Sequence, residues 1–108
     1  MKFDPRDVKW FAALSRAASE GIQASKLLFP IERQKDGVEV YLVESSWKNG
    51  SVYVVEVHHG HDSASIVCGC KGGQQRRICK HAALAAFHAG LFPTARELFV
   101  AEVEEKVA

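Results

Sequence analysis

The chain has 108 residues and a formal net charge of +1, with 47% hydrophobic and 25% charged residues. This length suits one domain, and the composition is that of a globular protein rather than a disordered one. Because the net charge is near zero, the chain has no overall electrostatic field that would indicate a nucleic acid or a membrane as partner. No run approaches about 18 consecutive apolar residues, and the N-terminus lacks the apolar stretch of a signal peptide.

The N-terminal segment, about residues 4–30, is predicted to be helical. Asp4 is a suitable helix cap, Pro5 suits the first helical position, and Gly21 suits the helix end. Residues 22–29 are predicted to form a second short helix, ended by the proline that follows. The apolar stripe of the first helix is expected at Val8, Phe11, Leu14 and Ala18.

The middle of the chain changes to the alternating pattern of β-strands. We predict strands over residues 38–46 and 51–58, joined at Asn49-Gly50, a dipeptide typical of hairpin turns. A third short strand is expected over residues 64–67, leading directly into Cys68. Val52 and Val54 share one side of the second strand, and the hairpin valines are expected in the core.

Helical patterning returns in the last part of the chain. We predict a helix over about residues 81–89, ended by Gly90, with Leu84 and Phe87 in the core. A final helix is expected over about residues 94–106. The fold class is therefore α+β: a small antiparallel hairpin or sheet and a helix, flanked by N- and C-terminal helices in one domain over residues 1–108.

All three cysteines lie in a twelve-residue window, in the pattern Cys68-Gly69-Cys70, eight residues, Cys79-Lys80-His81. An odd, clustered set favours metal binding in a reducing compartment over disulfides. Three thiolates and one imidazole complete the tetrahedron that zinc prefers, and residues two apart on an extended chain point to the same side. We therefore predict one structural zinc ion, bound by Cys68, Cys70, Cys79 and His81.

The cysteines have two other interpretations. They can be small buried core residues with an incidental histidine nearby. A thioredoxin-like redox pair is less favoured, because that motif requires C-x-x-C beside a βαβ unit. Neither feature is present in this sequence.

The ligand pattern resembles the SWIM zinc finger family, whose motif is C-x-C, a variable gap, then C-x-H. The chain also has the wording Cys79-Lys80-His81-Ala82 that is typical of the family, and the resemblance covers roughly residues 38–90. It implies a zinc-binding core associated with DNA binding and with protein–protein contacts. Members occur in transposases, in proteins linked to helicase-like ATPases, in a kinase with ubiquitin-ligase activity and in partners of recombinases. The resemblance therefore indicates the structure of the metal site better than the function of the protein.

The segment between the cysteines is basic. Lys71, Arg76, Arg77 and Lys80 lie there without an acidic residue, so the segment keeps a charge of about +3 after the −1 of a zinc trithiolate. These cations can offset the charge of the thiolates or contact phosphates, and phosphate contact is slightly favoured. Trp47 and Lys48, at the hairpin turn, can extend such a surface by stacking, although Trp47 and Trp10 better fit partly buried packing.

Other charged groups have less specific interpretations. His58, His59 and His61 precede the first cysteine and are expected to be solvated turn residues. A less favoured interpretation is that one of them is a competing metal ligand or hydrogen-bonds to a metal ligand. His88 lies on the helix after the motif and is interpreted in the same way. The segment 96–108 has a net charge of −2 and fits a solvated helix face or a partner surface.

The sequence is compatible with three functions. It favours a zinc-dependent nucleic-acid-binding module, most suited to DNA and acting with a larger DNA-processing enzyme. The alternative is an adaptor for a recombinase, helicase-like ATPase or transposase, or a self-associating module. An enzyme is least favoured, since four protein ligands close the zinc site and no GxxxxGK[ST] loop is present. We expect an intracellular protein, cytoplasmic or in the nucleoid or nucleus, with no membrane partner and no small-molecule substrate.

Overall fold

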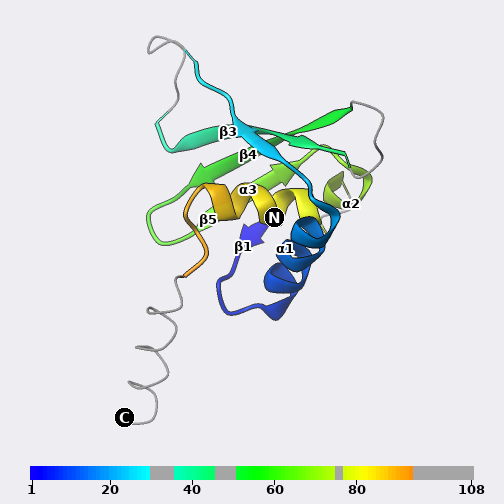
Figure 1. Cartoon of the computed structure of the whole chain (residues 1–108). Helices are drawn as coiled ribbons and strands as arrows, with labels where there is room; N and C mark the ends of the chain where they lie inside the picture. The colour runs from blue at the N-terminus through cyan, green and yellow to red at the C-terminus, as the bar shows by residue number, and fades with distance from the viewer. Residues whose placement is uncertain (30–35, 46–50, 75–76, 94–108) are drawn as a thin grey trace.

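The computed structural model describes residues 1–29, 36–45, 51–74 and 77–93, shown in colour in Figure 1. These residues form an α+β fold with a five-stranded antiparallel sheet in the order β1-β5-β4-β3-β2, which confirms the predicted fold class. The final helix predicted over 94–106, and Trp47 with Lys48, lie outside the described residues. The strands are β1 Lys2–Phe3, β2 Ala24–Lys26, β3 Val38–Glu44, β4 Val52–His59 and β5 Ala64–Cys68, and the helices are α1 Val8–Glu20, α2 Lys71–Gln74 and α3 Lys80–His88.

The three central strands lie where the alternating pattern predicts them, but the face that enters the core differs. Val55 pairs with Tyr41 on one side and with Cys68 on the other, and its side chain is fully buried. Val52 and Val54, expected in the core, are 51% and 53% exposed, because helix α3 covers the opposite face of the sheet. Strict alternation along a strand then sends one set of valines inward and the other outward.

The two longer helices lie on one face of the sheet, with α3 next to the strands and α1 packed on α3 (Figure 1). Helix α3 is consequently buried along its length from His81 to Ala86. Its small alanine side chains allow the sheet on one side and α1 on the other to approach closely. A helix that is apolar on every side is typically buried in this way. Leu84 lies in the core as predicted, whereas Phe87 is 53% exposed, so its predicted core position is wrong.

Helix α1 begins later than predicted and buries a different stripe. The carboxylate of Asp7, rather than Asp4, caps the helix by accepting a hydrogen bond from the Lys9 backbone N–H at 2.9 Å. Trp10 packs edge-to-face against Phe3, with 4.9 Å between ring centroids, and this contact orients the helix. The helix ends at Gly21, as predicted, with a left-handed φ of 67°. The buried residues are Trp10, Ala13 and Ala17 instead of the stripe that begins at Val8.

The second helix predicted over residues 22–29 is wrong, because this segment contains the edge strand β2. Ala24 pairs with Val43, and the backbone N–H of Gln23 donates to the Glu44 carboxylate at 2.8 Å. Pairing with β3 supplies hydrogen bonds that a short isolated helix would have to form by itself. Among the described segments, no helix is long and apolar enough to cross a membrane.

The contact between Trp10 and Phe3 predicts a large difference between two substitutions on the same helix. Trp10→Ala removes a side chain that is 1% exposed and should lower the free energy of unfolding by about 3–5 kcal/mol. Val8→Ala changes a side chain that is 75% exposed and should alter it by less than about 0.5 kcal/mol. Urea denaturation followed by circular dichroism measures both, and equal midpoints for the two variants would contradict this orientation of α1.

Candidate metal centre

The end of strand β5 and the beginning of helix α3 bring the three cysteines and His81 together. Cys68 is the last residue of β5, Cys70 lies directly after it, and Cys79 and His81 lie at the start of α3. The Sγ atoms and an imidazole nitrogen all lie within 4.8 Å of one another. The four residues chosen from their sequence spacing therefore form one cluster, and they can bind one metal ion.

The cluster fits a tetrahedral metal in size and chemistry. Donors about 2.3 Å from a central ion would lie about 3.8 Å apart, which is compatible with the observed spread. His81 is 6% exposed, and neither of its ring nitrogens has a hydrogen-bond partner within the described part of the chain. An unpartnered buried imidazole is unfavourable, and coordination would satisfy one of its nitrogens. A set of three thiolates and one imidazole is typical of structural zinc.

Backbone hydrogen bonds prepare two of the sulfurs to carry negative charge. Cys79 caps helix α3, and its Sγ accepts from the Ala82 N–H at 3.3 Å, while Cys70 Sγ accepts from the Gly73 N–H at 3.3 Å. The hydrogen bond from the Cys68 thiol and the Ala82 N–H lower the pKa of Cys79, although burial opposes them. The same pairing with Cys79, together with burial, raises the pKa of Cys68.

The segment between the two cysteine pairs contains a short helix, α2, packed on β5. Gly73 lies so close to this strand that an added Cβ would collide with the carbonyl oxygen of Cys68 and lie 2.8 Å from its Cβ. A Cβ at Gly72 would be 3.6 Å from Cys79 Cβ, an ordinary contact. Only the second of these adjacent glycines is therefore required by close packing.

The predicted basic residues occupy different environments. Lys71 and Arg77 are exposed, whereas the ammonium group of Lys80 forms an ion pair with Glu20 of α1 at 2.7 Å, and Arg76 lies outside the described residues. Lys80 thus joins α3 to α1 in addition to adding charge near the cluster. This ion pair was not predictable from the spacing of the basic residues.

A hollow of about 370 Å³ opens onto the cluster, since Cys70, Cys79 and His81 are among the residues that line it. It is also lined by two residues that sequence reasoning did not select. Arg16 reaches it from α1 and Tyr53 from β4. The Tyr53 ring lies 4.7 Å from the His81 ring, centroid to centroid. Tyr53 could have been found from the pairing of Val55 with Cys68, because Tyr53 lies two residues before Val55 on the same side of β4. No local pattern in the sequence indicates Arg16.

The upstream histidines do not belong to the metal centre. His59 Nε2 lies 2.6 Å from the Glu39 carboxylate, and His58 lies 3.9 Å from Glu56. Burial raises the pKa of Glu39, but hydrogen bonds from Tyr41, His59 and Lys26 outweigh it and hold this pKa below its ordinary value. The expectation that His58 and His59 are turn residues is wrong, because both lie in strand β4, where they contact Glu56 and Glu39 away from the cluster.

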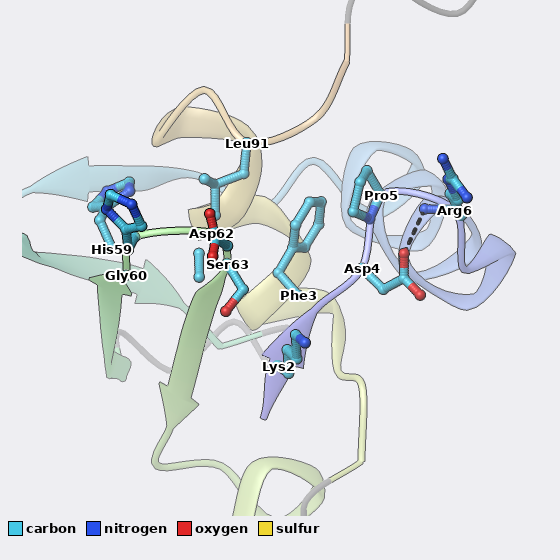
Figure 2. A pocket seen from close by; sticks show the side chains of 12 residues that line it. Lys2, Phe3, Asp4, Pro5, Arg6, His59, Gly60, Asp62, Ser63 and Leu91 are labelled. Carbon is cyan, nitrogen blue, oxygen red and sulfur yellow. Dashed lines mark hydrogen bonds between the residues drawn. The ribbon is translucent and has the colours of Figure 1, made fainter. Parts of the chain in front are cut away.

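A second cavity, of about 840 Å³, lies between β1 with the residues after it and the turn from β4 to β5 (Figure 2). His61 and Asp62 line it, together with Asp4, whose carboxylate accepts a hydrogen bond from the Arg6 N–H at 2.9 Å. In the ranges that the structure covers, the cysteine–histidine cluster is the one group of three or more His, Cys, Asp or Glu residues placed to hold a metal.

No protein-family model, curated protein or solved structure matches the chain. The resemblance to SWIM zinc fingers consequently depends on the spacing of Cys68, Cys70, Cys79 and His81. Function is inferred from the geometry of this cluster and of the surface around it.

Substitution of the two adjacent glycines of α2 should affect zinc binding to different extents. Gly73→Ala should force β5 and α2 apart and weaken zinc binding by about tenfold or more, the effect typical of disturbed support around ligands. Gly72→Ala is the matched control and should bind zinc within about twofold of the parent, because its Cβ meets only ordinary contacts. Competition with a chromogenic chelator measures both affinities. Equal zinc affinity in the two variants would contradict the packing of α2 on Cys68.

Proposed function

We propose that the chain is a zinc-dependent nucleic-acid-binding module of the SWIM type, suited to DNA, that acts with a larger DNA-processing enzyme. The observation that carries this proposal is the pair of exposed cations beside the cluster. Within the part of the chain that the structure describes, Lys71 and Arg77 have no carboxylate within 4.0 Å. Cations without an internal partner remain available to phosphates.

Zinc has a structural role in this proposal. Cys68, Cys70, Cys79 and His81 supply all four donors of a tetrahedron, so no position remains for a reacting water or substrate. Bound zinc would cross-link the end of β5 to the start of α3 and thereby hold the basic segment between them. We therefore propose a binding module without catalytic activity of its own.

The expected mode of binding follows from the small number of cations. Lys71 and Arg77, with Arg76 added from the sequence, can contact a few phosphates, while Lys80 already pairs with Glu20. Ordering these groups beforehand reduces the entropy lost on binding. Binding should be weak, salt-sensitive and largely independent of sequence, with dissociation constants of roughly 10⁻⁴–10⁻⁶ M at physiological salt.

Reversing the two exposed charges tests this function. Lys71→Glu combined with Arg77→Glu should weaken DNA binding by at least about tenfold, because two phosphate contacts become repulsive. Lys9→Glu, an exposed charge reversal near the start of α1, is the control and should have less than about a twofold effect. Fluorescence anisotropy with labelled DNA at about 50 and about 200 mM salt measures the affinities, and zinc content is determined for every variant.

Two results would overturn the proposal. The first is parent-like binding by the zinc-loaded double variant. The second is a parent affinity that does not change with salt, since phosphate contact releases counterions and must depend on salt.

A second function, that of an adaptor for a recombinase, helicase-like ATPase or transposase, is favoured by a different observation. The face of the sheet opposite the helices exposes Val52, Val54 and Val67, which are 50–53% exposed. Neighbouring apolar side chains on a surface are typical of protein interfaces. Pull-down from native extract with and without nuclease separates the two functions: a protein partner that survives nuclease treatment and is lost in Val54→Asp supports the adaptor.

A further inference from the structure

The hollow beside the metal cluster is surrounded by cations from separate elements. Arg16 comes from α1, Lys71 from α2, and Arg77 from the residues between α2 and α3. These elements meet at one end of the sheet, where α2 lies close to the C-terminal half of α1 (Figure 1). The cations thus line an open hollow of about 370 Å³ on the surface.

Among the described residues, those that line this hollow carry a net positive charge. None of the described residues that line it is acidic, and Lys80, which also lines it, is paired with Glu20. In the described ranges, Arg16 has no carboxylate within 4.0 Å, as is also true of Lys71 and Arg77. Three unpaired cations exceed the charge of −1 that a zinc trithiolate would place nearby, so the hollow attracts anions.

Tyr53 provides an aromatic surface in the same hollow. Its backbone is fixed in β4 by pairing with Val43, and its ring is tilted by 51° against the buried ring of His81. The strand fixes the backbone of Tyr53 and the His81 ring contacts its side chain, so that little entropy is lost when a ligand stacks on it. Stacking between a base and an aromatic side chain is a principal source of affinity for single strands.

We propose that the hollow binds one unstacked nucleobase against Tyr53 while Arg16, Lys71 and Arg77 contact the flanking phosphates. Single-stranded nucleic acid is therefore the preferred ligand. This inference rests on the proposed function and specifies its substrate class. A duplex keeps its bases stacked and paired, so it can offer phosphates to the cations but cannot place a base in a concave site without the cost of flipping it.

The test compares strands and variants of the full-length, zinc-loaded chain. Labelled oligothymidine of about 12 nucleotides and a duplex of the same length are titrated by fluorescence anisotropy. The parent should bind the single strand about tenfold more tightly than the duplex. Tyr53→Leu should remove this preference by weakening single-strand binding about tenfold while leaving duplex binding unchanged. Tyr53→Phe retains the ring and should bind both ligands as the parent does, and zinc content controls for damage to His81.

Arg16→Glu tests the contribution of α1, with Lys9→Glu on the same helix as the matched control. Arg16→Glu should weaken single-strand binding several-fold, and Lys9→Glu should not. Two results would overturn the inference: equal affinity of the parent for both ligands, and parent-like binding of the single strand by zinc-loaded Tyr53→Leu. In either case, salt-dependent DNA binding would still support the proposed function. Absence of salt-dependent binding to either ligand would overturn both.

Discussion

The rest of the structure depends on the meeting of the end of β5 and the start of α3, where four side chains lie close enough to bind one metal ion. Cys68 is fixed by its pairing with Val55 at the centre of the sheet, and Cys79 is fixed as the cap of α3. A metal ion held between them would set the position of α3 on the sheet. The free energy of metal binding would then contribute to folding, which matters in a chain with room for only a small core.

The position of α3 determines the remaining packing. Because this helix lies between the sheet and α1, its residues from Ala82 to Ala86 are buried on every side, and alanine is the side chain that permits two close neighbours. Helix α1 is held on top by Trp10, which contacts Phe3, and by the ion pair between Lys80 and Glu20. The placement of α1 in turn brings Arg16 to the hollow beside the cluster, so that the metal centre and the proposed binding surface share one scaffold.

Local signals in the sequence predict the metal centre and the central strands. The ligands lie in pairs two residues apart, and the hairpin strands alternate around Asn49-Gly50, so both could be assigned without knowledge of distant contacts. Features that depend on distant partners were not predictable in this way. Strand β2 forms because β3 offers an open edge, and α1 buries Trp10 because Phe3 lies near it. The hollow is lined by Arg16 of α1 and by Tyr53 of β4. Because these residues are far apart in the sequence, no local pattern predicts that they lie at one site.

The most direct test of the central claim is X-ray absorption spectroscopy of the purified chain at the zinc edge, because it reports the identity and distance of the ligands. We predict three sulfur ligands at about 2.3 Å and one nitrogen ligand at about 2.0 Å. The Cys79→Ser variant should lose one sulfur or lose zinc altogether. A first shell dominated by oxygen or nitrogen, or a parent chain that folds without retaining zinc, would contradict a structure organised around Cys68, Cys70, Cys79 and His81.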